Sequence, residues 1–140
     1  MTGLALSMVM QAALLANGAQ PYDQAFHEAN AGGRPLLVLV GADWCPGCRT
    51  MKQSVLPRME QTGRLSGVNY AVVNTDSHSR LASGLMRGST IPQLIVFSKT
   101  SNGWHREQIT GAASEASVLG LVGRAVAAQA AVAPVAASAE

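Results

Sequence analysis

The chain has 140 residues, enough for one domain with a continuous core and too few for two ordinary domains. Apolar residues make up 48% of it and charged residues 13%, which argues against an intrinsically disordered chain. The formal charge of +2, with scattered Lys and Arg, argues against a nucleic-acid-binding surface.

Residues 1–20 are interpreted as an apolar leader or an extra N-terminal helix. Residues 4–15 are almost wholly apolar, and Ala16-Asn17-Gly18 offers the small residues that a signal peptidase favours. No Lys or Arg precedes Arg34, so the basic start of a secretory leader is missing, and the run is too short for a stable membrane span. A leader predicts an extracytoplasmic protein, periplasmic or secreted, and the alternative is a cytoplasmic one.

The folded domain is expected over residues 21–129. Its first helix, residues 22–31, has an apolar face in which Tyr22, Ala25, Phe26 and Ala29 follow the i, i+3, i+4, i+7 spacing. The continuous aliphatic run at residues 36–40 predicts a central strand that is covered on both faces.

The later elements are expected in the order helix, strand, helix, strand, strand, helix. Their predicted ranges are a helix from Pro46 past Met59 that is bent or divided at Pro57, a strand at 68–74, a helix at 77–86, a hairpin of strands at 94–97 and 104–110, and a helix from Ser114. Phe97 and Trp104 are expected in the core, and residues 130–140 form an Ala-rich tail. This order predicts an α/β fold with a central mixed sheet of about four strands, flanking helices and an antiparallel hairpin on the C-terminal side.

Cys45 and Cys48 are the only cysteines of the chain. A disulfide between them closes a very small loop and adds little stability, so a reactive pair explains them better than a structural bond. If a helix begins at Pro46, Cys45 lies at its N-terminus, where free N–H groups and the helix dipole favour a thiolate. Cys45 is therefore the predicted nucleophile, and Cys48, expected to be more buried, is predicted to resolve the mixed disulfide.

Three neighbours are predicted to support this pair. Pro46 suits the first helical position because its missing N–H would have no partner there. Gly47 adds no bulk beside the sulfurs, and Trp44 supplies an apolar, partly exposed platform.

From Tyr22 to Ala128 the chain resembles the thioredoxin-like family, in its bacterial secreted or periplasmic type. The matching motifs are Ala42-Asp43-Trp44-Cys45-Pro46-Gly47-Cys48, Thr90-Ile91-Pro92 before a strand, and Gly111 before the last helix. The resemblance implies a thioredoxin-like fold and a protein-disulfide oxidoreductase with no cofactor beyond the Cys45–Cys48 disulfide.

The resemblance also implies how a client is held. Pro92 is expected to be cis and to lie against the cysteines, and the backbone of Ile91 is expected to pair with an extended client segment. Protein thiols or disulfides and a redox partner protein are the implied partners. No nucleic-acid partner and no stable membrane span are expected, and the chain is expected to be a monomer.

Two departures from the family pattern leave questions open. Many thioredoxins carry a buried acid six positions before the first cysteine, where this chain has Leu39, so the proton acceptor for Cys48 is not identified. Asp43 is nearby but is expected to face solvent. The pair Pro46-Gly47 replaces the Gly-Pro of thioredoxin, which leaves reductase, oxidase and isomerase activity all open.

Two other functions remain as alternatives. The first is a non-catalytic module that binds extended peptides in the groove around Trp44 and Pro92. The second is a glutaredoxin-like, glutathione-dependent reductase, since glutaredoxin motifs also begin Cys-Pro, although the glycine pair that glutaredoxins carry after the hairpin is absent. No metal site is expected, because two cysteines need further ligands and the three histidines are scattered.

Overall fold

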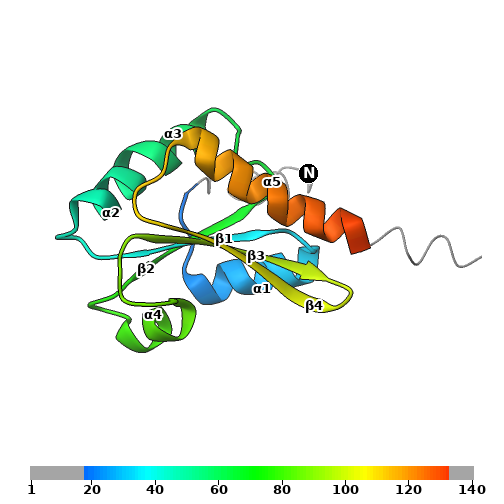
Figure 1. The fold of residues 1–140 in the computed structure, drawn as a ribbon, viewed down its shortest axis with the longest axis horizontal. Coiled ribbons are helices and arrows are strands. Elements are labelled where there is room, and N and C mark those ends of the chain that lie inside the picture. Colours follow the sequence, from blue (N-terminus) through cyan, green and yellow to red (C-terminus); the bar gives the residue numbers. More distant parts are fainter. Residues whose placement is uncertain (1–17, 133–140) are drawn as a thin grey trace, which may run out of the picture.

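A four-stranded mixed sheet forms the centre of the computed structural model, which describes residues 18–132 (Figure 1). The strands are β1 (Leu36–Gly41), β2 (Asn69–Asn74), β3 (Gln93–Thr100) and β4 (Gly103–Thr110), in the spatial order β2-β1-β3-β4. Strand β1 is parallel to β2 and antiparallel to β3, and β3 forms a hairpin with β4. The predicted fold class is confirmed.

Helices cover both faces of this sheet (Figure 1). They are α1 (Tyr22–Gly32), α2 (Pro46–Thr50), the π-helical segment η2 (Met51–Val55), α3 (Leu56–Gln61), α4 (Ser79–Leu85) and α5 (Glu115–Val132). Helices α1 and α4 pack on one face, and α3 and α5 pack on the other. None of the helices within residues 18–132 has the length and apolar character needed to cross a membrane.

Strand β1 explains why its sequence is continuously apolar. All six of its residues are buried, because successive side chains alternate between two covered faces. Leu37 and Leu39 pack with α3 and α5, while Leu36, Val38 and Val40 pack with α1 and α4. The strand thus contributes to both cores.

The helix after the cysteines is divided close to the position predicted from Pro57. Proline has no N–H to donate to the carbonyl four residues earlier, so a regular α-helix cannot continue through it. The chain inserts η2 before α3, and the N–H of Leu56 donates to the carbonyl of Met51 in the wider π pattern.

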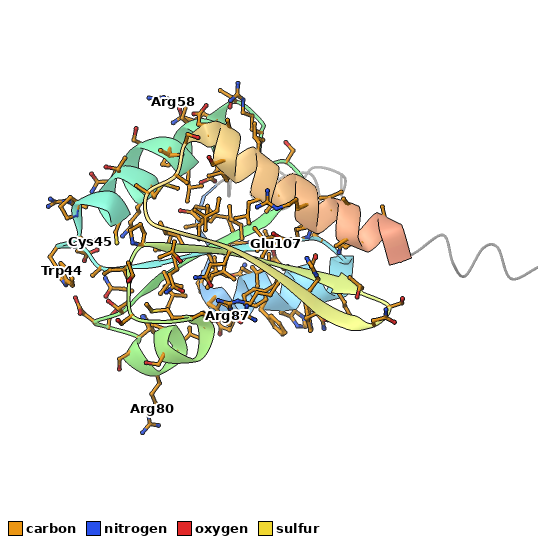
Figure 2. All side chains as sticks on the ribbon, in the orientation of Figure 1. Trp44, Cys45, Arg58, Arg80, Arg87 and Glu107 are labelled. Atoms are coloured by element: carbon orange, nitrogen blue, oxygen red, sulfur yellow. The ribbon has the colours of Figure 1, made fainter. Side chains whose placement is uncertain are left out.

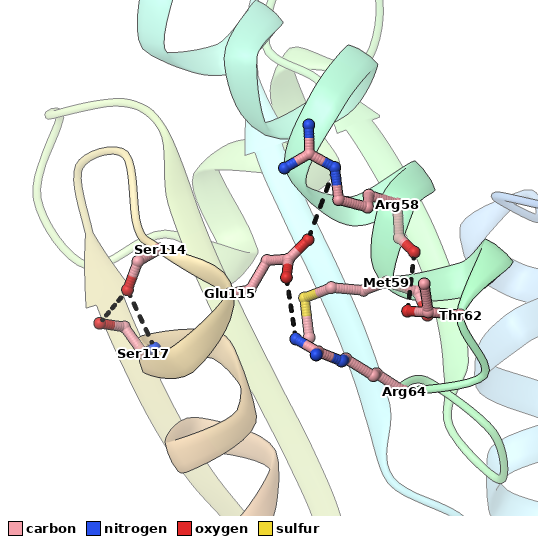
Figure 3. Close-up of polar contacts among 7 residues, drawn as sticks. All are labelled: Arg58, Met59, Thr62, Arg64, Ser114, Glu115 and Ser117. Atoms are coloured by element: carbon pink, nitrogen blue, oxygen red, sulfur yellow. Dashed lines mark hydrogen bonds and ion pairs between the residues drawn. The ribbon is translucent and has the colours of Figure 1, made fainter.

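The start of α5 is tied to the end of α3 by Glu115 (Figure 3). Its carboxylate lies 2.9 Å from Arg64 Nη1 and 3.9 Å from Arg58 Nε. The N–H of Ser117 donates to the Ser114 hydroxyl, which caps the helix as the sequence predicts.

Several boundaries differ from those expected. Helix α4 begins at Ser79 rather than at residue 77, because the Asn74 side chain accepts the N–H groups of Asp76 and Ser77 and holds them in a turn. Strand β3 is longer than residues 94–97 at both ends. Helix α5 continues past residue 129, since alanine is a strong helix former. The predictions for residues 1–17 and 133–140 lie outside the described residues.

Phe97 and Trp104 are expected in the core, but Phe97 is only partly buried against it and Trp104 is partly exposed. Phe26, on the apolar face predicted for the first helix, is partly exposed as well. Phe26 is 37% exposed and Trp104 40% exposed, and their rings lie 5.4 Å apart, centroid to centroid. Trp104 stands on β4, the edge strand of the sheet, which has a neighbour on one side alone. The two rings therefore cover each other at the surface instead of entering the core.

Candidate active site

Cys45 stands where β1 has ended and α2 begins. It is the N-cap residue of α2, with extended backbone angles, and Pro46 takes the first helical position as predicted. The backbone N–H of Cys48 donates to Cys45 Sγ at 3.3 Å. The local fold thus directs an N–H group of the first helical turn at Cys45 Sγ.

Cys48 lies one turn into the helix and faces the interior. Both cysteines are free thiols, and they are almost equally buried, at 6% for Cys45 and 4% for Cys48. Burial, with the hydrogen bond to Cys45 as the next cause, raises the pKa of Cys48 to about 11. The Cys48 thiol is therefore protonated at neutral pH.

Pro92 packs against the cysteine motif from the start of β3. The Ile91–Pro92 peptide bond is cis, and the Ile91 carbonyl lies 4.0 Å from Cys45 Sγ. A Cβ atom at Gly47 would lie 3.2 Å from Pro92 Cδ, so any larger residue there would press on the proline. Gly47 thus allows Ile91 and Pro92 to lie close to the reactive sulfur.

Trp44 extends into solvent beside Cys45, at the end of the molecule where Figure 2 labels both residues. It is 66% exposed, and its Nε1–H donates to Asp76 Oδ2 at 3.1 Å. Asp76 was not predicted from the sequence, although it follows β2, and parallel strands such as β1 and β2 end at the same edge of a sheet. The structure brings all seven predicted site residues together at this edge.

Comparison with known proteins identifies the family. A family model described as thioredoxin-like matches residues 18–99, more than half of the chain. The chain belongs to the thioredoxin-like family. No curated protein sequence matches it.

Solved thioredoxin structures share the fold of this thioredoxin-like chain. A thioredoxin from Thermus thermophilus is 23% identical, with a TM-score of 0.62, and the match covers 79% of this chain and 87% of that one. Chloroplastic thioredoxin z is 19% identical, with a TM-score of 0.60 and coverage of 79% and 94%. Trxlp from Edwardsiella tarda is 27% identical, with a TM-score of 0.59 and coverage of 75% and 98%.

Behind Cys48, this thioredoxin-like site has a pocket of about 110 Å³. Leu39, Gly41 and Cys48 line it together with polar residues that include Asp43 and Lys52. Asp43 is exposed, as expected, and its carboxylate lies 3.7 Å from Lys52 Nζ. The apolar Leu39 side chain therefore borders the same space as the Cys48 thiol.

Gly41 is a second residue that the sequence analysis missed. A Cβ atom at this position would lie 2.6 Å from Cys48 Sγ and 2.9 Å from Cys48 Cβ. The Cys48 side chain thus occupies the space that a residue larger than glycine would need. Gly41 could have been predicted from its position at the end of β1, four residues before Cys45.

The two cysteines of the site would need further ligands to hold a metal ion. Within residues 18–132, no group of three or more His, Cys, Asp or Glu side chains is arranged to hold a metal ion. His27 and His78 are exposed, and His105 is paired with Glu107 at 3.2 Å on β4. The sulfur groups at this edge of the sheet are the two free thiols of Cys45 and Cys48.

Proposed function

We propose that this chain is a protein-disulfide oxidoreductase that uses Cys45 and Cys48 as its redox pair. The observation that carries the proposal is the position of Cys45 Sγ, which receives the N–H of Cys48 at 3.3 Å and lies 4.0 Å from the Ile91 carbonyl. A thiolate at Cys45, beside the main chain of Ile91, is suited to attack a disulfide within an extended peptide.

The proposed reaction has two exchange steps. Cys45 thiolate attacks one sulfur of a client disulfide, forming a mixed disulfide and releasing the other client sulfur as a thiol. Cys48 then loses its proton and attacks Cys45 Sγ, which forms the Cys45–Cys48 disulfide and releases the second client thiol. Two electrons pass from the cysteine pair to the client, and a redox partner protein returns them. The reverse sequence oxidises a client dithiol.

We also propose that client backbone docks beside Pro92. The Ile91 peptide unit offers hydrogen-bonding groups next to Cys45, and the exposed Trp44 ring offers an apolar surface. In this proposal the chain acts as a monomer, with the cysteine pair as its only redox group.

The assay that tests the proposal is reduction of insulin by dithiothreitol. The wild-type chain should accelerate it, Cys45→Ser should abolish the acceleration, and Cys48→Ser should trap the mixed disulfide. A wild-type chain that gives no turnover but binds peptides would instead indicate a non-catalytic module. Turnover with glutathione, and none with a protein reductant, would indicate a glutaredoxin-like enzyme.

The direction of electron transfer is tested by the redox potential of the pair. A value near about −270 mV is typical of a reductase, and one near about −120 mV of a strong oxidant.

We propose an extracytoplasmic location because residues 4–15 are almost wholly apolar and small residues follow them. Export of a reporter protein fused behind residues 1–20 would support it. Retention of the fusion in the cytoplasm would support the alternative.

A further inference from the structure

Gln93 directly follows Pro92. Within residues 18–132, its side-chain amide forms hydrogen bonds only to the main chain of the preceding loop, residues 87–90. The residue is fully buried. Its Oε1 accepts the backbone N–H of Arg87 at 3.1 Å, and its Nε2 donates to the carbonyls of Arg87 at 2.8 Å and Thr90 at 3.0 Å. Both ends of the amide are therefore bonded to the main chain of residues 87–90.

This loop has little else to fix its backbone. Residues 87–91 lie outside the helices and strands. Within the described part of the chain, their N–H and carbonyl groups make no hydrogen bond to another main-chain group. A buried amide is costly unless its polar atoms are paired, and the loop carbonyls meet that need. The loop and Gln93 thus stabilise each other.

The loop that Gln93 anchors leads directly to Ile91, whose main chain is the proposed docking site for a client. Thr90 precedes Ile91, whose carbonyl lies 4.0 Å from Cys45 Sγ. On the other side, the Pro92 carbonyl accepts the N–H of Gly111 at 2.8 Å. The backbone around Ile91 is therefore held after the proline by Gly111 and before it by the bonds that Gln93 makes.

We infer that Gln93 is a positioning residue for protein clients, holding the main chain of Thr90 and Ile91 in the orientation with which an extended client segment pairs. The inference rests on the proposed function. A client protein gains binding free energy from that pairing, whereas a small disulfide has no peptide backbone to pair. Gln93 should consequently matter for protein disulfides and be of little importance for small ones.

The test compares the two kinds of substrate in the full chain. Gln93→Met keeps the length of the side chain but removes its amide. We expect KM for a fluorescein-labelled insulin disulfide to rise about tenfold while kcat changes little, because the loop loses its anchoring hydrogen bonds. The rate at which the reduced chain attacks the small disulfide 5,5′-dithiobis(2-nitrobenzoate) should change less than about twofold, since that step needs only the thiolate.

Ser98→Ala is the matched control. Ser98 is fully buried on the same strand, and its hydroxyl has no hydrogen-bond partner within residues 18–132, so it makes none of the bonds that Gln93 makes to the loop. This variant should leave both rates unchanged. An unchanged KM for insulin in Gln93→Met, or an equal loss with both substrates, would overturn the inference.

Amide hydrogen exchange of the wild-type chain provides a test that does not depend on a variant folding. The backbone N–H of Arg87, which donates to Gln93 Oε1, should exchange much more slowly than the backbone N–H of Ser89 in the same loop. Equal exchange rates would contradict the inference that Gln93 anchors the loop. A wild-type chain without insulin turnover would contradict the proposed function, while protection of Arg87 would still report on the anchor.

Discussion

The two sulfurs of the site are three residues apart, yet they have different surroundings. Cys45 Sγ receives the backbone N–H of Cys48. Cys48 is enclosed at the pocket, and burial raises its pKa to about 11. Since both side chains have nearly equal exposed fractions, the N–H at Cys45 Sγ and the raised pKa of Cys48 should decide which thiol reacts first.

Alkylation of the reduced chain should therefore label Cys45 before Cys48. At mildly acidic pH, iodoacetamide followed by mass spectrometry should find the adduct on Cys45, because the Cys48 thiol stays protonated. In a Cys45→Ser variant, labelling of Cys48 should increase with pH up to about 11, since burial is the largest cause of its raised pKa. First labelling of Cys48 in the wild-type chain would reverse the roles that we assign.

Gly41→Ala should slow turnover while leaving the fold intact. The added Cβ would lie 2.6 Å from Cys48 Sγ, so the resolving sulfur must move. A displacement of this size predicts a loss of about tenfold or more in insulin reduction. Gly84→Ala is the control, because a Cβ there meets nothing within 4 Å and replaces a helical glycine of α4. Equal activity of the two variants would contradict the prediction.

At the scale of elements, the sequence predicted the helices and strands whose positions depend on residues close together in the chain. The apolar run of β1, the start of α2 at Pro46 and the division of the helix near Pro57 all follow from residues close in sequence. The start of α4 was wrong because one side chain, Asn74, rearranges the turn before it. The prediction that Trp104 lies in the core was wrong, because the order of strands puts β4 at an edge of the sheet, and local sequence does not determine that order.

The contact between α3 and α5 should contribute modestly to stability. Glu115→Gln removes the charge that pairs with Arg64 and Arg58, and both arginines are largely solvated. We expect the free energy of unfolding to fall by about 0.5–1 kcal/mol in low salt, and by less in high salt, because ions screen exposed pairs. Denaturant titrations at two salt concentrations measure this.

Asp23→Asn is the control for that variant. Asp23 also lies in the first turn of a helix, α1, but it has no salt bridge within residues 18–132. It shows how much of the effect comes from the helix dipole. An equal, salt-independent loss in both variants would show that the ion pairs contribute nothing.

At the scale of the molecule, the site forms where the carboxyl ends of β1 and β2 meet the start of β3. The sequence identified the residues that belong to contiguous motifs, from Trp44 to Cys48 and at Ile91-Pro92. Asp76, Gly41 and Gln93 were not predicted, because their importance depends on what the fold brings next to them. A side chain far from the motif enters the site only through sheet topology.

Leu39 belongs both to the hydrophobic core and to the site. It packs with the buried residues of α3 and α5, and it also lines the pocket beside Cys48. Leu39→Asp should place a proton acceptor beside the resolving thiol and speed release of a client from a preformed mixed disulfide by about tenfold or more at pH 7. The same change should lower the free energy of unfolding by about 3 kcal/mol, since it removes apolar packing and buries a polar group.

The pH dependence of this variant separates the two effects. Burial raises the pKa of the introduced carboxyl above the ordinary value of about 3.9, so the destabilisation is smallest below that pH and grows as pH rises through the folded-state pKa. Leu39→Asn, which cannot take up the proton, should lose similar stability without this pH dependence and without faster release. If release from the mixed disulfide is equally slow in both variants, the missing acid at residue 39 does not limit the resolving step, and Cys48 must pass its proton to water or to another group at the pocket.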